Sequence, residues 1–298
     1  MLNIHRHGKV LVCIFSVVVG TACIAQSSDA KSNSVGSSAD AGAKDIQFFV
    51  GQRVWLASWD QSYLDALVVI PNPLNPVPII QQTNSRAASN TTVLPQTSFG
   101  VRFQNWTLST TVMPNTNFTS GGLAVNDTIR RNELDLSVGY AFSPYIVGSV
   151  VYKTGRIDQV ATANATRLTG LGGNYKVEGL LLGISATAPL QGPLALYGNF
   201  GYGPARQTIF ASGSSDLRFK GGYQISEVGL AYRLTDDRAF LGFASLSMQL
   251  GYRSQTVTLN DLNFGTFSTG PVPTLIGTQY KDVRSTTQGM VFGIVAAF

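Results

Sequence analysis

The sequence has neither histidine nor cysteine after its first 25 residues. Its two histidines, His5 and His7, and its two cysteines, Cys13 and Cys23, all lie in that opening segment. If the segment is removed, the remaining chain lacks the side chains that most often serve as general base, thiol nucleophile or zinc ligand. The absence argues against an enzyme and predicts no catalytic residue, no metal site and no cofactor.

Charged residues are also scarce, at 12% of the chain, and no run of eighteen or more apolar residues follows residue 25. A helical membrane protein would need such runs, because a helix requires about 20 apolar residues to cross the bilayer. The chain is nevertheless poor in charge for a soluble domain of its size. Alternating β-strands reconcile the two observations, because each strand is apolar on one face only.

The last thirteen residues, Thr286 to Phe298, form the clearest such strand. Its small face, which suits a crowded interior, carries Gly289, Val291, Gly293, Val295 and Ala297. Its bulky face suits lipid, whereas a half-buried soluble strand would place polar residues there. The stretch resembles the closing strand of Gram-negative outer-membrane β-barrel proteins. The resemblance implies an outer-membrane location, contact with outer-membrane lipids and recognition by the barrel-assembly machinery of Met290, Phe292, Ile294 and Phe298.

Nine further strands are predicted from alternating apolar residues, at 47–59, 95–103, 106–113, 133–142, 145–154, 176–188, 194–202, 223–234 and 239–253. The connections between successive strands alternate strictly, with long links after the first, third, fifth, seventh and ninth strands. That rhythm predicts an all-β fold, an antiparallel up-and-down transmembrane barrel of about ten strands. It also predicts long extracellular loops and short periplasmic turns.

Residues 1–25 resemble a secretory signal peptide. Arg6 and Lys9 give a basic start, Val10 to Val19 an apolar core, and Cys23 to Ala25 a small-x-small cleavage site. An uncleaved anchor and lipidation at Cys23 are the alternatives, although the apolar core is too short for a spanning helix.

Residues 26–44 are rich in Ser, Ala and Gly, which predicts a flexible periplasmic lead before a barrel over residues 45–298. Removing the signal would take two of the 21 basic residues and leave 19 against 16 acidic ones. This mild balance, without a Lys/Arg cluster, gives no indication of nucleic-acid binding.

Charged residues within the strands are predicted to face the lumen. A charge that faces lipid at mid-bilayer costs about 2–4 kcal/mol, which places Arg53 inside. Buried charges must pair or stay hydrated, so a salt-bridge network is favoured over a carboxylate active site. The predicted lumen-facing network comprises Arg53, Arg102, Glu133, Asp135, Glu227, Arg233 and Arg253.

The first long connection contains an apolar stretch with four prolines, which cannot continue a hydrogen-bonded ladder. An apolar patch of this size usually marks a contact. We expect it to fold over the barrel mouth as a lid or plug, with lipid or partner contact and a disordered loop as alternatives. It comprises Val68, Val69, Ile70, Pro71, Pro73, Leu74, Pro76, Pro78, Ile79 and Ile80.

Three functional classes remain open from the sequence. A narrow porin-like conduit for small solutes, or a structural barrel, ranks first, because it needs only a charged lumen and a mouth loop, and the sequence supplies both. Ten strands should leave at most a narrow path, since wide channels need about sixteen strands. A surface-exposed binding protein or adhesin that acts through its loops ranks second. Ten strands also resemble the omptin proteases, but the outer-membrane hydrolases of this kind employ a histidine. An outer-membrane hydrolase therefore ranks third.

Overall fold

The structure is a computed structural model that describes residues 11–14, 22–25, 46–70, 79–119, 128–160, 174–210, 216–235, 245–267 and 276–298. Within these ranges, no helix is long and apolar enough to cross a membrane. The strands are β1 (Leu11–Ile14), β2 (Ala22–Ala25), β3 (Ile46–Ile70), β4 (Ile79–Ala88), β5 (Thr92–Phe103), β6 (Trp106–Thr119), β7 (Thr128–Ser143), β8 (Ile146–Val160), β9 (Asn174–Pro189), β10 (Leu194–Phe210), β11 (Leu217–Thr235), β12 (Ser245–Phe267) and β13 (Ile276–Ala297).

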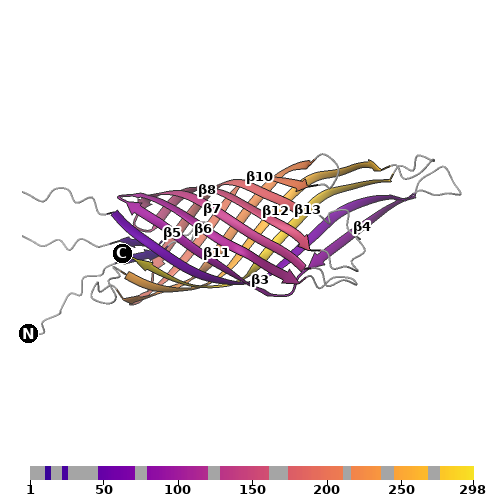
Figure 1. Ribbon diagram of the computed structural model, residues 1–298. Coiled ribbons are helices and arrows are strands. Elements are labelled where there is room, and N and C mark those ends of the chain that lie inside the picture. Colours follow the sequence, from indigo (N-terminus) through magenta and orange to yellow (C-terminus); the bar gives the residue numbers. More distant parts are fainter. Residues whose placement is uncertain are drawn as a thin grey trace, which may run out of the picture.

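Ten strands close into an antiparallel barrel (Figure 1). Each of β5 to β13 pairs with its neighbour in the chain, and β3 pairs with β5 along residues 46–57. Closure comes from β13, which returns to β3 with a register that runs from Ala297↔Phe49 to Thr278↔Val68. Closure leaves no open edge within the bilayer, where an unsatisfied backbone group would cost several kcal/mol. The predicted ten-stranded barrel is confirmed.

Side chains alternate between lipid and lumen along every barrel strand. On β13, Phe292 and Ile294 are about half exposed, whereas Val291 and Val295 are buried. Leu182 on β9 is 71% exposed, which water would disfavour but a bilayer would not. The exterior is therefore an apolar belt of the kind found in outer-membrane barrels.

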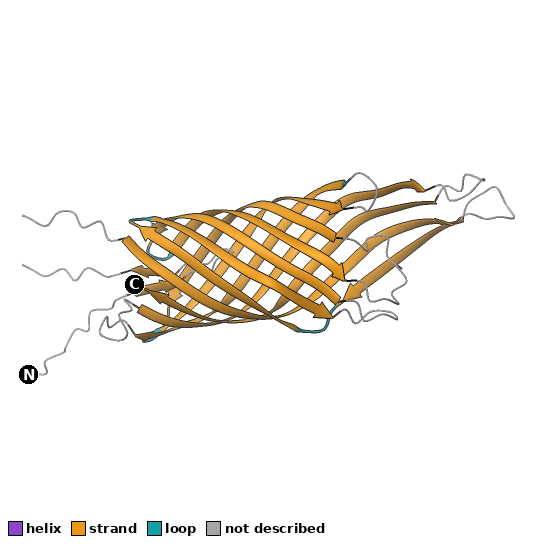
Figure 2. Ribbon diagram, in the orientation of Figure 1, coloured by secondary structure: helices purple, strands orange, loops and turns teal. Residues whose placement is uncertain are grey.

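Short turns mark one end of the barrel, which we call the turn end (teal in Figure 2, beside the C-terminus). Gln104 has φ 55° there, a left-handed conformation that suits a tight two-residue turn. Aromatic side chains gather on the outside nearby. The ring of Tyr140 lies 4.9 Å from that of Trp106 and 5.4 Å from that of Phe142, both edge to face. These residues form part of an aromatic girdle at the membrane surface.

The opposite end, which we call the loop end, extends further than the sequence predicts. Strands β3, β12 and β13 have 25, 23 and 22 residues, and they continue into segments predicted as long connections. The sequence-based boundaries are wrong there because they follow the apolar alternation. Alternation ends where the outer face leaves lipid, but backbone hydrogen bonding continues in water.

The predicted lid falls partly within these extended strands. Val68, Val69 and Ile70 end β3, and they pair with the start of β4, as in Ile70↔Ile79 and Val69↔Ile80. In the described part these residues therefore form a hairpin rather than a loop, and β4 lies beyond the barrel wall (Figure 1). The intervening prolines and Leu74 lie outside the described residues, so the lid over the mouth stays a prediction.

Two short strands, β1 and β2, pair in the predicted signal peptide, with Cys13 opposite Cys23. They form a separate two-stranded sheet. The predicted cleavage after residue 25 stays a prediction, and the predicted flexible lead at 26–44 lies outside the described residues.

We expect the folded protein in detergent to migrate faster on a gel before boiling than after it. A closed barrel resists unfolding by the detergent because every strand is hydrogen-bonded on both sides. Circular dichroism of the unboiled sample should be β-rich. A helical spectrum would contradict the fold. So would protein that stays monomeric in water without detergent, because the apolar exterior should make it aggregate.

Candidate functional site

Among the described side chains, seven charged ones are buried in the barrel interior, none more than 6% exposed. Four are basic and three are acidic, and they come from β3, β7, β8, β11 and β12. A buried charge is tolerated only when it is paired and hydrogen-bonded. The seven residues, which we call the lumen network, are Arg53, Arg131, Glu133, Asp135, Lys153, Glu227 and Arg253.

One part of the lumen network is centred on Glu227 of β11. Arg53 of β3 donates from Nη2 to Glu227 Oε1, and Arg253 of β12 donates from Nη1 to Oε2 over 3.5 Å. Tyr197 of β10 donates its hydroxyl to Oε1 over 2.9 Å. A single carboxylate thus binds two arginines and a tyrosine, which ties together four strands around the lumen.

Glycines in the barrel wall make room for Tyr197. A Cβ added to Gly251 would lie 2.5 Å from the Tyr197 hydroxyl, and one added to Gly229 would lie 2.8 Å from its ring. Both contacts are too short for any other residue without displacement of the ring. The two glycines therefore allow Tyr197 to lie against the wall and reach Glu227.

A second part of the lumen network is centred on Glu133 of β7. Lys153 of β8 donates to Glu133 Oε2 over 2.6 Å and to Asp135 Oδ1 over 2.7 Å. Arg131 donates from Nε to Glu133 Oε1 over 2.7 Å. Two acids and two bases balance one another here, as charge burial requires.

Gln255 of β12 joins the two parts. Its Nε2 donates to Glu133 Oε1 over 2.8 Å, and its Oε1 accepts from Arg253 Nη2 over 3.4 Å. Charged and polar side chains are thus linked continuously from Arg53 on one wall to Asp135 on another. The linkage crosses the lumen rather than following one strand.

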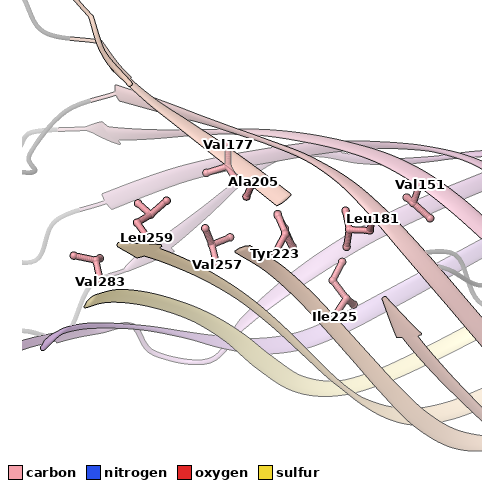
Figure 3. Close-up of a cluster of buried hydrophobic side chains, with 9 residues drawn as sticks. All are labelled: Val151, Val177, Leu181, Ala205, Tyr223, Ile225, Val257, Leu259 and Val283. Carbon is pink, nitrogen blue, oxygen red and sulfur yellow. The ribbon is translucent and has the colours of Figure 1, made fainter. Parts of the chain in front are cut away.

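Towards the loop end, two clusters of apolar side chains lie in the interior beside buried polar residues such as Gln61 and Gln207. One cluster, shown in Figure 3, includes Val257, Leu259 and Val283 on β12 and β13 and is completed by residues of β8 to β11. A second cluster on the opposite wall includes Trp55, Met113 and Phe118. Tyr175 packs against both clusters. Apolar side chains therefore pack in the lumen next to the charged network.

The structure places five of the seven predicted lumen residues in the lumen network: Arg53, Glu133, Asp135, Glu227 and Arg253. Arg102 and Arg233 also lie on the inward face, but near the turn end, where each is only half-buried and outside the lumen network. Arg102 donates from Nε to the carbonyl oxygen of Gln104, over 3.1 Å.

Sequence reasoning missed Arg131 and Lys153. Arg131 falls in a predicted long connection, although β7 begins at Thr128. Lys153 lies in a strand with two apolar faces, whose facing could not be assigned. The available signal was spacing: Arg131 is two residues from Glu133 and so shares its face.

The lumen network offers little for catalysis. Its carboxylates already accept hydrogen bonds from arginines, a lysine, a tyrosine and a glutamine. Within the described ranges, no three His, Cys, Asp or Glu side chains come close enough to hold a metal ion. A cavity of about 30 Å³ beside Arg131, Glu133 and Thr287 has room for roughly one or two water molecules.

The sequence matches no protein-family profile and no curated protein. Several solved outer-membrane proteins have a similar strand arrangement. The outer membrane protease OmpT from Escherichia coli is 11% identical, with 86% of this chain and 98% of that chain covered and a TM-score of 0.48. Neisserial surface protein A is 13% identical, with 84% and 97% covered and a TM-score of 0.33.

The toluene transporter TodX from Pseudomonas putida is 8% identical, with 86% of this chain and 90% of that chain covered and a TM-score of 0.30. Likenesses at this level carry no argument about activity or ligand. The assignment as an outer-membrane-type β-barrel rests on the closed strand pairing and the apolar exterior described above.

Proposed function

We propose that the protein is a structural outer-membrane barrel with a closed lumen, which anchors a surface-exposed β-sheet outside the cell. The observation that carries the proposal is the lumen network, because its side chains meet across the interior from five strands. A barrel of this strand number is wide enough for side chains to fill and too narrow for a large aqueous channel. The packed apolar clusters towards the loop end support closure further.

The extended strands support the surface role. Beyond the barrel, β12, β13, β3 and β4 remain paired in this order, through Phe267↔Ile276, Thr278↔Val68 and Ile70↔Ile79. In barrels of this kind the longer connections lie outside the cell. We call this part the sheet extension and propose that it presents the loops to the surroundings.

The proposal includes no enzymatic role. The lumen carboxylates are held in ion pairs, and the part of the chain that follows residue 25 has no histidine to act as a base. We therefore expect purified protein to show no hydrolysis of peptides or phospholipids above that of a boiled sample.

Planar-bilayer recording tests the closed lumen. Inserted wild-type protein should give no stable conductance, because ions cannot pass a layer in which charged side chains bind one another. Insertion should be verified in parallel vesicles by protease protection. A small but stable conductance from unboiled protein would contradict the proposal and favour the second candidate, a narrow conduit for small solutes.

The conduit remains the second candidate because the layer that blocks the lumen is polar and has a water-sized cavity beside it. If this layer is a gate, changing Gln255 to Ala should increase conductance, since Gln255 joins its two parts. Changing Gln288 to Ala, on the outer face of β13, is the matched control. An equal, zero conductance for both variants would support the structural barrel.

A further inference from the structure

A row of basic residues lies on the outer face of β7 to β11, towards the loop end. The pairing places them close together, as in Arg156↔Lys176 and Arg206↔Lys220. Acidic residues on the same face number three, Asp158, Glu178 and Asp216. The excess is therefore positive. The basic residues are Arg130, Arg156, Lys176, Arg206, Arg218 and Lys220.

Two of the acids are already neutralised within the row. Lys176 Nζ donates to Glu178 over 2.7 Å, and Tyr152 donates its hydroxyl to the same oxygen over 2.8 Å. Arg156 Nε donates to Asp158 over 2.8 Å. Among the described residues, Arg206, Arg218 and Lys220 take part in no ion pair within 4 Å. Arg130 on β7 is likewise in none of these ion pairs. Arg206, Arg218 and Lys220, which lie on the neighbouring strands β10 and β11 and which we call the basic triad, are three of these four charges.

The arrangement of the basic triad is unfavourable on its own. Arg206 on β10 lies between Lys220 on β11, whose like charge repels it, and Glu178 on β9, which is already bound by Lys176 and Tyr152. Arg218 lies two residues before Lys220, on the same face of β11. An anion placed between these side chains would convert repulsion into attraction. The pairing thus points to a negatively charged ligand on the outer wall.

A groove beside the basic triad has both polar and apolar walls. Its volume is about 490 Å³, and its lining includes the bases Arg206 and Lys220, the acid Glu178, and Tyr152, Leu180 and Pro204, so its formal charge is positive by one. Leu180 is 53% exposed and belongs to the apolar belt. The groove therefore spans the boundary between lipid tails and headgroups, with its cations at the headgroup level.

The basic triad is not a general property of the barrel rim. A groove of about 510 Å³ on the other side, over β11 to β13 and β3, is lined by threonines and glutamines with one acid, Asp60, and one base, Arg284. Its formal charges cancel. The positive surplus is thus local to β8–β11, although both grooves lie on the outer wall.

We propose that the basic triad binds the phosphorylated headgroup of a lipid in the outer leaflet. The phosphate would bridge Arg206 and Lys220, and an acyl chain would lie along Leu180 and Tyr152. Phosphate suits this position because arginine and lysine are its usual ligands in proteins. The inference is independent of whether the lumen conducts, since all the residues involved face outward.

The test uses full-length protein refolded in detergent and the bisphosphorylated glycolipid lipid A, with its dephosphorylated form as a second probe. Lipid retained after gel filtration is measured for the wild type, for the double variant R206Q/K220Q and for the control R284Q. Each lysine or arginine beside anionic lipid contributes roughly a factor of five in affinity. We expect the double variant to retain at least about tenfold less lipid A, and R284Q to match the wild type.

Two results of the retention assay would overturn the inference. One is equal retention of lipid A by the wild type and the double variant when both keep their faster gel migration before boiling. The other is equal retention of the phosphorylated and dephosphorylated lipids by the wild type. Inorganic phosphate added at 10-fold excess over lipid A should displace little of it; complete displacement would show a site for free phosphate and contradict a lipid site.

Discussion

Replacing Glu227 with Gln is expected to lower the free energy of unfolding by about 3–5 kcal/mol, the cost of breaking a buried ion pair. Glu227 is the carboxylate that both Arg53 and Arg253 contact, and all three side chains are buried. Without it, two arginines that cannot lose their protons would remain buried in the lumen without the carboxylate that binds both of them. Unfolding by urea in phospholipid vesicles, followed by tryptophan fluorescence, measures the loss.

The matched control for this experiment is Glu178→Gln. Glu178 also forms an ion pair, with Lys176, but its side chain is 30% exposed and faces outward. Exposed pairs contribute about 0–1 kcal/mol, so this variant should unfold near the wild type. Similar urea midpoints for the Glu227 variant and the wild type would show that the lumen network is not a buried, mutually dependent set.

Replacing Leu250 with Arg is expected to cost about 2–4 kcal/mol. Leu250 lies on the outer face of β12, opposite Leu230 and Phe292, and all three side chains are exposed to the surroundings of the barrel. In a soluble protein an exposed Leu→Arg change would cost almost nothing. The large cost arises only because the surroundings are hydrocarbon. The same urea titration in vesicles measures it.

Gln288→Arg is the control, because Gln288 is also exposed on the outer wall but lies beyond the apolar side chains, beside Ser254 and Ser58. The Gln288→Arg change should lower the free energy of unfolding by only about 0–1 kcal/mol, because a charge near the membrane surface stays in contact with water. If the two variants lost the same free energy of unfolding, the apolar belt would not lie at Leu250. If neither variant lost stability, the exterior would not face lipid, which would contradict a membrane barrel.

The sequence predicts the barrel itself well because two independent signals agree. Alternation places Phe292 outward and Val291 inward on the closing strand, and link lengths alternate between long and short. Alternation arises because the outer face contacts lipid. Link lengths alternate because every second link lies on the same side of the membrane. Gln52 breaks the apolar pattern yet faces outward, where its side chain accepts a hydrogen bond from Thr97 over 2.7 Å. One polar residue can thus be tolerated where a cross-strand neighbour satisfies it.

The strand ends and the lumen partners could not be predicted as well. β12 continues to Phe267, but its outer face is polar from Ser254 to Asn260, so hydropathy gives no boundary. Lumen contacts depend on register between distant strands, and the Gln255 to Glu133 hydrogen bond joins residues 122 positions apart. Arg102 and Arg233 have the right facing but lie too near the turn end. Depth along the barrel axis, unlike facing, cannot be deduced from alternation alone.

Closure of the barrel between β3 and β13 is the central claim, and disulfide cross-linking tests it most directly. Ile294 of β13 lies opposite Gln52 of β3, and both natural cysteines lie in the first 25 residues. With Cys13 and Cys23 replaced by Ser, the variant Q52C/I294C should form an oxidised cross-link in membranes, as should Q52C/T97C between β3 and β5. The variant Q52C/L230C, which joins β3 to β11, should not. Cross-linking of Q52C/T97C without Q52C/I294C would show an open sheet and contradict the structure.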